Sequence, residues 1–207
     1  MPYTHDYSAI LLKKRIAMAR PFWPRLSQTL ALRLNNAAWG RSFNTHSVMD
    51  EVAYLEDPVR ARPTSTKPAQ QLSGPILGRF CHKHFTDARS LGQNLINQWF
   101  GPYAEKHGVL RTEIRKVLES LGETAGADLD EKDARAAAGR LAHEVVTGGM
   151  SRLNARKAMT GEWLIYFVHN GENYYLDIAL HAEQQDESAL YERLREGCEW
   201  EYPFAFK

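Results

Sequence analysis

Residues 161–181 limit the possible folds of this chain more than any other part of the sequence. Residues 162–169 read EWLIYFVH, a run of aromatic and β-branched side chains that favours an extended strand. Asn170 and Gly171 follow, a pair that readily adopts the two positive φ angles of a type I′ turn, and residues 172–181 return as a second strand. The sequence therefore predicts an antiparallel β-hairpin near the C-terminus.

A two-residue turn also predicts the register, because it determines which residues of the two strands lie opposite each other. One face is then almost wholly apolar, with the opposed pairs His169–Glu172, Phe167–Tyr174, Ile165–Leu176 and Trp163–Ile178. The other face has Tyr166 opposite Tyr175 and carries Asp177 and His181 further along. An aspartate and a histidine beside two tyrosines are not typical of a core, so this face is a candidate for function.

Outside the hairpin, apolar residues recur at the three-to-four spacing of amphipathic helices. The spacing predicts helices near residues 8–19, 24–40, 86–101, 114–122 and 130–148, and a last one that begins at Ser188. Thr86 and Asp130 are expected to cap two of them, and Gly148 and Gly149 to end the fifth. The aromatic residues after Cys198 alternate as in a final strand.

Residues 57–75 contain four prolines, few apolar side chains and no periodicity, so we expect a loop or linker there. We predict an α+β protein with three parts: a helical N-terminal region at 1–56, the linker at 57–75, and an α+β domain at 76–207. In this domain, helices pack on a small antiparallel sheet built around the hairpin.

The composition excludes several classes of protein. The two cysteines, Cys81 and Cys198, are too few for a disulfide framework, and no C-x-x-C spacing suggests structural zinc. Lys13, Lys14 and Arg15 interrupt the only candidate for a signal peptide, and no apolar run approaches the ~20 residues that span a bilayer. We therefore expect a cytoplasmic protein without a membrane partner.

The formal net charge is +1, but the charges are distributed unevenly along the chain. Through Arg41 the only acidic residue is Asp6, against the basic residues Lys13, Lys14, Arg15, Arg20, Arg25, Arg33 and Arg41. Residues 183–207 are mainly acidic instead. Two interpretations stay open: the basic helices bind nucleic acid or lipid headgroups, or they present a solvated basic face.

A cluster of titratable side chains follows the linker: Arg79, His82, Lys83 and His84. If residues 76–85 are extended, the period of two puts both histidines on one face and Lys83 on the other. Two imidazoles on one face can act as acid and base near neutral pH, or bind a metal ion. Lys83 and Arg79 suit the negative charge of a phosphate. The alternative is a pair of solvent-facing histidines at the entry of a helix.

The hairpin supplies further candidates. Asp177 precedes His181 by two residues on the same predicted face and can orient its ring through a hydrogen bond. Tyr166 and Tyr175 can stack a base, or simply cover a helix. The sequence lacks the motifs of serine hydrolases, zinc proteases and nucleotide-binding loops, and we expect neither a metal nor a cofactor.

Residues 160–166, TGEWLIY, together with a second strand that ends in His181, resemble the core sheet of RelE-like ribonuclease toxins and, more loosely, the wider group with barnase and EndoU-type enzymes. The resemblance covers some twenty residues, and this chain is longer than the usual toxin and not strongly basic. It implies helices ahead of a small antiparallel sheet, metal-independent RNA cleavage, and a neutralising protein partner as in toxin–antitoxin systems.

Two functional hypotheses follow from these residues. The first is a metal-independent, RNA-directed nuclease in which His82 or His84 acts as acid or base, and Asp177 with His181 supplies the second proton-transfer group. In this hypothesis Lys83 and Arg79 stabilise phosphate, and Tyr166 or Tyr175 stacks the base. It requires that chain folding bring these groups to one cleft.

The second hypothesis is a non-catalytic regulatory or interaction module. Its basic N-terminal helices would bind nucleic acid or an acidic partner.

Overall fold

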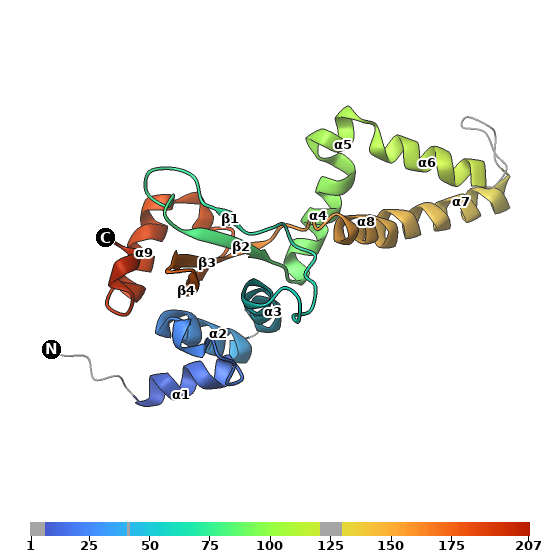
Figure 1. The fold of residues 1–207 in the computed structure, drawn as a ribbon. Coiled ribbons are helices and arrows are strands. Elements are labelled where there is room, and N and C mark those ends of the chain that lie inside the picture. Colours follow the sequence, from blue (N-terminus) through green and yellow to red (C-terminus); the bar gives the residue numbers. More distant parts are fainter. Residues whose placement is uncertain (1–6, 41, 121–129) are drawn as a thin grey trace. The chain divides into compact units, whose positions relative to one another are not determined.

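The structure, a computed structural model, describes residues 7–40, 42–120 and 130–207 (Figure 1). Arg41 and the predicted helix end at Gly122 lie outside these ranges. The chain forms two compact units. Residues up to Asp87 and residues 160–207 form the first, here called the sheet unit, and residues 88–159 form the second, the helical unit.

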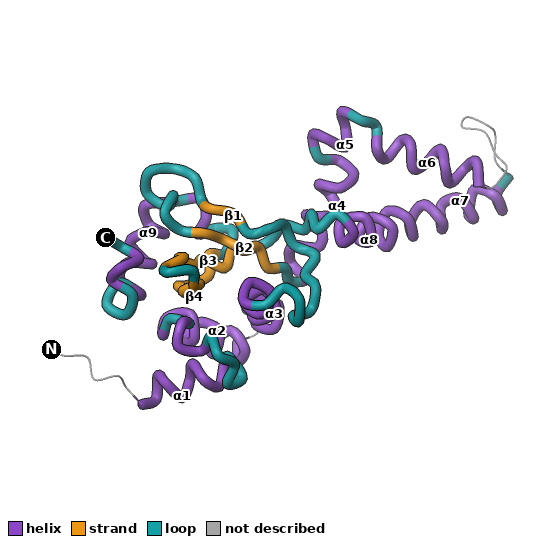
Figure 2. The backbone as a smooth tube through the Cα atoms, viewed as in Figure 1, coloured by secondary structure: helices purple, strands orange, loops and turns teal. Residues whose placement is uncertain are grey.

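The sheet unit contains a four-stranded antiparallel sheet in the order β1-β2-β3-β4 (Figure 2). The strands are β1 (Gln70–Gln71), β2 (Cys81–Phe85), β3 (Glu162–His169) and β4 (Glu172–Ala179). Asn170 and Gly171 have φ angles of 51° and 79° and form the predicted turn between β3 and β4. The predicted α+β class, with helices packed on a sheet built around this hairpin, is confirmed.

The predicted register holds from the turn to the pair Tyr166–Tyr175 and then shifts by one residue. Ile165 lies opposite Asp177 and Trp163 opposite Ala179, so the predicted pairs with Leu176 and Ile178 are wrong. The cause is a bulge in β4. Ser27, near the start of the chain, binds the free edge of β4 at the bulge. It donates its backbone N–H to Tyr175 O at 2.9 Å and its hydroxyl to Leu176 O. Asp177 therefore faces away from Tyr175.

Two helices cover one face of the sheet, α2 (Gln28–Gly40) and α3 (Thr45–Glu56). Helix α1 (Tyr7–Ile16) packs on α2, and a 3-10 turn, η1 (Trp23–Arg25), lies between α1 and α2 in the sequence. Asn44 begins α3 by accepting hydrogen bonds from the backbone N–H groups of His46 and Ser47. The apolar sides of these helices and of the strands meet in a first core, which includes Leu26, Leu30, Leu34, Val48, Val52, Phe85, Leu164, Tyr166, Tyr175 and Ile178.

The opposite face packs against α9 (Glu187–Cys198) and the C-terminal tail (Figure 1). Asp186 caps α9 through the N–H of Ala189, where Ser188 was expected. The tail folds into a 3-10 turn, η4 (Pro203–Ala205), and the predicted final strand is absent from this segment. Its rings fill a second core instead, which includes Leu72, Leu77, Phe80, Ile165, Leu176, Leu190, Leu194, Tyr202 and Phe206.

The helical unit consists of α4 (Ala88–Phe100), α5 (Pro102–Lys106), α6 (Val109–Ser120), α7 (Glu131–His143) and α8 (Gly149–Ala155). Asp130 caps α7 as predicted. The helix does not end at Gly148, because a π-helical turn, η2 (Glu144–Gly148), continues α7 into α8. The indole N–H of Trp99 donates to Val145 O at 2.8 Å within this turn.

An ion triad stabilises the π-helical turn. Arg152 pairs with Glu113 of α6 at 2.8 Å and with Glu144 at 3.1 Å. A Cβ atom at Gly148 would lie 2.2 Å from a carboxylate oxygen of Glu144, so the glycine leaves the space that this contact needs. This accounts for a glycine inside a continuous helix, where the residue is otherwise unfavourable.

The compact units divide the chain at residues other than 57–75. The N-terminal helices and the sheet share the first core, and residues 66–72 run along β2. Residues 88–159 are instead inserted between two paired strands, β2 and β3.

Candidate functional site

His82 and His84 lie side by side on the second-core face of β2. His82 pairs with Ile165 and His84 with Trp163, as strand alternation requires. The centroids of the two imidazole rings are 5.2 Å apart, and the ring of His82 is 4.8 Å from that of Trp163. The spacing of the two histidines thus brings both rings to one place.

Both imidazoles lie beside backbone groups. Nδ1 of His84 lies 3.0 Å from Gly161 O, and the backbone of Gln70, the β1 partner of His82, offsets part of the effect of burial on the pKa of His82. Nδ1 of His82 is buried without a hydrogen-bond partner. Burial, aided by the neighbouring His84, lowers the pKa of His82 to about 4, and burial also lowers the pKa of His84. Both rings are therefore neutral at pH 7.

Lys83 points to the opposite face and is not available to a phosphate. Its ammonium lies 3.0 Å from Oε2 of Glu51 on α3 and donates to Thr66 and to Lys67 O. The side chain is 1% exposed. The predicted binding of phosphate by Lys83 is wrong, because its ammonium group is already paired with a carboxylate inside the protein.

Asp177 belongs to a buried cluster of charges, here called the aspartate clamp. Nη1 of Arg33 on α2 lies 3.2 Å from its carboxylate, and Arg193 on α9 donates to the same oxygen. Arg33 also binds Glu183 at 2.6 Å, and both arginines donate to Ile178 O. The positive charges of the two arginines equal the negative charges of Asp177 and Glu183. The aspartate clamp joins α2, β4 and α9.

His181 does not join Asp177 or the β2 histidines. It is exposed in the turn beyond the end of β4, and its carbonyl accepts from Gln185. Strand β3 lies between β4 and β2, so two strand spacings, about 10 Å, separate β4 from the pair His82–His84. The predicted orientation of His181 by Asp177 is wrong, because the bulge in β4 turns the carboxylate toward Arg193.

The expected substrate-binding residues have structural contacts. Tyr166 and Tyr175 lie opposite each other, as predicted, with ring centroids 6.0 Å apart. Both are buried in the first core, and Tyr175 donates to Oε1 of Glu56 at 2.8 Å. Burial raises the pKa of both hydroxyls. Arg79 is exposed and donates to the carbonyl of Lys207. The tyrosines therefore cover helices and cannot stack a base in this arrangement.

Ion pairs within the sheet unit account for part of the uneven charge along the sequence. Lys13 pairs with Glu201, and Arg25 pairs with Glu56 and, at 2.7 Å, with Glu172. Arg33 enters the aspartate clamp. Basic residues near the start of the chain thus neutralise acidic residues that lie mostly near its end.

A pocket beside α3 gathers three arginines that remain at the surface. Arg20, Arg60 and Arg62 line a cavity of about 520 Å³, here called the arginine pocket, with Phe22 and Ala53 among its apolar lining. The side chains of Arg60 and Arg62 are 89% and 83% exposed. Sequence reasoning missed this site because Arg60 and Arg62 fall in the proline-rich segment 57–75; their alternation in DPVRARP was the available signal.

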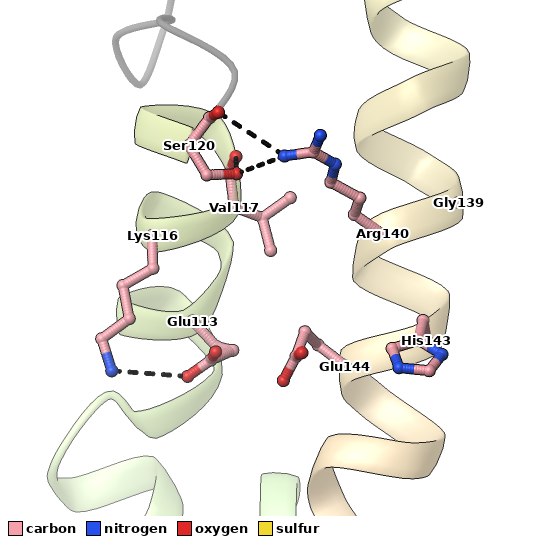
Figure 3. Close-up of a pocket in the computed structure, with 8 residues that line it drawn as sticks. All are labelled: Glu113, Lys116, Val117, Ser120, Gly139, Arg140, His143 and Glu144. Atoms are coloured by element: carbon pink, nitrogen blue, oxygen red, sulfur yellow. Dashed lines mark hydrogen bonds and ion pairs between the residues drawn. The ribbon is translucent and has the colours of Figure 1, made fainter.

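A second pocket, of about 460 Å³, lies between α6 and α7 in the helical unit (Figure 3). Its charged side chains mostly pair with one another. Lys116 lies 3.7 Å from Glu113, and Arg140 donates to the hydroxyl of Ser120 at 2.9 Å. Glu144 enters the pocket from the other helix and is held by Arg152. This lining leaves little unpaired charge for a ligand.

We expect Asp177→Ala to lower the free energy of unfolding by about 3 kcal/mol, because it leaves two partly buried guanidinium groups without their shared carboxylate. Glu172→Ala is the matched control. Its carboxylate pairs with Arg25 but is 53% exposed, so the expected loss is below about 1 kcal/mol. Urea unfolding measures both, and equal losses would contradict a clamp at Asp177.

We expect the lowered pKa of His82 to make stability depend on pH. As the pH falls from 6.5 to about 4, the unfolded chain protonates this histidine and the folded protein does not, so stability decreases by up to about 3 kcal/mol. His82→Phe removes this contribution. Urea unfolding from pH 7 to pH 4.5 should show a smaller decrease for the variant than for the wild type, and parallel curves would refute the assignment.

Among the described residues, no group of three or more His, Cys, Asp or Glu side chains is placed to hold a metal ion. Within the same ranges, every helix is too short or too polar to span a membrane. Comparisons of the chain with protein-family models, with curated proteins and with solved structures found no significant match.

Proposed function

We propose that this protein is a non-catalytic binding module that holds the phosphate backbone of nucleic acid in the arginine pocket. The observation that carries the proposal is the gathering of Arg20, Arg60 and Arg62 around one cavity. Guanidinium groups present forked donors that match phosphate oxygens, and phosphate contacts supply most of the affinity of sequence-independent binding.

The arginines of the pocket are free to change partners. Arg60 lies 3.8 Å from Asp57 and Arg62 lies 3.9 Å from Asp50, which are long and exposed ion pairs. Such pairs contribute about 0–1 kcal/mol each, less than a charge-assisted bond to phosphate. Asp50 and Asp57 oppose the binding of an anion, and Glu56 is neutralised by Arg25. The arginine side chains must therefore turn away from the two aspartates to bind.

Three other basic residues of the N-terminal segment contribute little to this surface. Lys13, Arg25 and Arg33 are occupied by carboxylates of the same unit. The proposed interface is thus narrower than the basic arm suggested by the sequence. It uses one arginine that follows α1 and two that follow α3.

The test is fluorescence anisotropy with a labelled single-stranded RNA and a labelled DNA duplex at several salt concentrations. Three phosphate contacts predict that the logarithm of the binding constant falls with the logarithm of the salt concentration. The expected slope is about −2 for the single strand and about −3 for the duplex. The triple variant Arg20→Gln, Arg60→Gln, Arg62→Gln should lose most of this slope and bind at least about tenfold more weakly.

The matched control removes the same charge elsewhere, with Arg111→Gln, Arg115→Gln and Arg135→Gln in the helical unit. These three arginines are exposed and outside the arginine pocket. Equal affinities of the two triple variants would show that net charge, and not the pocket, governs binding. Absence of binding by the wild type at low salt would also overturn the proposal.

A second candidate is RNA cleavage at the pair His82–His84, favoured by two neutral imidazoles whose centroids are 5.2 Å apart. One neutral ring can accept a proton, but the other can donate one only in its protonated form, which the lowered pKa values make scarce at pH 7. Incubation of purified protein with RNA in excess EDTA should then yield fragments, and His84→Ala should reduce their rate of formation by at least about a hundredfold. His181→Ala is the control, and cleavage that is lost with EDTA or unchanged in His84→Ala overturns this candidate.

A further inference from the structure

The His82–His84 pair has one property that neither candidate function requires. One imidazole has a buried ring nitrogen without a hydrogen-bond partner, and the other can donate one ring N–H to a backbone carbonyl and leave its second nitrogen free. Histidines that bind metals have this arrangement: one ring N–H donates to a carbonyl or carboxylate, and the other nitrogen presents its lone pair to the ion.

His82 gives the clearer case. It is 8% exposed, and its Nδ1 is buried without a hydrogen-bond partner. In the tautomer that carries the proton on Nε2, Nδ1 presents a lone pair. A buried polar atom without a partner is unfavourable, and a bound ion is one of the accepted reasons for such an atom.

His84 can take the complementary state. Its Nδ1 lies 3.0 Å from Gly161 O, and in the tautomer that donates this bond, Nε2 presents a lone pair. The carbonyl is held firmly in place, because a Cβ atom on Gly161 would lie 2.2 Å from Phe85 O and the two segments are therefore in close contact. Metal binding at Nε2 would select this tautomer over the one that accepts from the N–H of Gly161 at 3.2 Å.

The ring separation fits one shared ion. In tetrahedral sites the metal–nitrogen distance is about 2.1 Å, which puts each ring centroid about 3.2 Å from the ion and two centroids about 5.2 Å apart. The observed separation is 5.2 Å. We propose that His82 and His84 bind one divalent transition-metal ion of the class that prefers imidazole, with zinc, nickel and copper as its members.

Two protein ligands leave the other coordination positions to water, and because Nδ1 of His82 is buried, the His82 ring must turn toward solvent to bind such an ion. No third His, Cys, Asp or Glu side chain joins the pair in the described part of the chain, so the ion exchanges more readily than in a closed structural site. The ammonium of Lys83 is paired with Glu51 on the far face of the sheet, which reduces its repulsion of the ion. Lys67 opposes binding from nearer the surface. The inference does not depend on the proposed function.

The test uses the full chain without an affinity tag. Titration calorimetry with Ni²⁺ or Zn²⁺ should detect one ion per protein, and His84→Ala should weaken binding by at least about tenfold. His46→Ala and His181→Ala, at exposed histidines outside the pair, should leave the affinity unchanged. Unchanged binding in His84→Ala, or binding that depends on His46 or His181, overturns the proposal.

A spectrum of the wild-type protein tests the same site even if a histidine variant folds poorly. Electron paramagnetic resonance of the wild type with one equivalent of Cu²⁺ should show splitting from two nitrogen ligands, and His84→Gln should show splitting from one. A wild-type spectrum without coupled nitrogen, or absence of any binding up to millimolar metal, also overturns the proposal.

Discussion

The aspartate clamp joins elements that are far apart in the sequence. Asp177 is 1% exposed and accepts from Arg33 of α2 and Arg193 of α9, while Glu183 neutralises the remaining positive charge. A single carboxylate at the edge of the sheet thus holds together the helices that cover its two faces. The pairs Lys13–Glu201 and Arg25–Glu56 extend the same principle to α1 and α3. The fold depends on this complementarity between basic and acidic segments.

Local patterns in the sequence were sufficient to predict much of the sheet unit. The strand residues, the Asn170–Gly171 turn and the shared face of His82 and His84 all follow from side-chain preferences and the period of two. The bulge in β4 did not, because it depends on pairing with Ser27, some 150 residues earlier. That single extra residue turned Asp177 toward α9 and removed the predicted catalytic pair.

The candidate site was predicted only in part for the same reason. Alternation correctly separates Lys83 from the histidines, but only the tertiary structure brings Glu51 to its ammonium. Likewise, nothing local to residues 57–75 reveals that Arg60 and Arg62 meet Arg20. Chemistry that depends on neighbours in the sequence can be anticipated, whereas chemistry that depends on packing between distant segments cannot.

Phe85 at the end of β2 pairs with Glu162 at the start of β3. The helical unit lies in the sequence between these two paired residues, which are one strand spacing, about 4.8 Å, apart. A short turn could join these residues and leave every hydrogen bond of the sheet in place. The strand pairing at Phe85–Glu162 therefore does not require the particular length of residues 88–159, and a segment of another length is compatible with the same sheet.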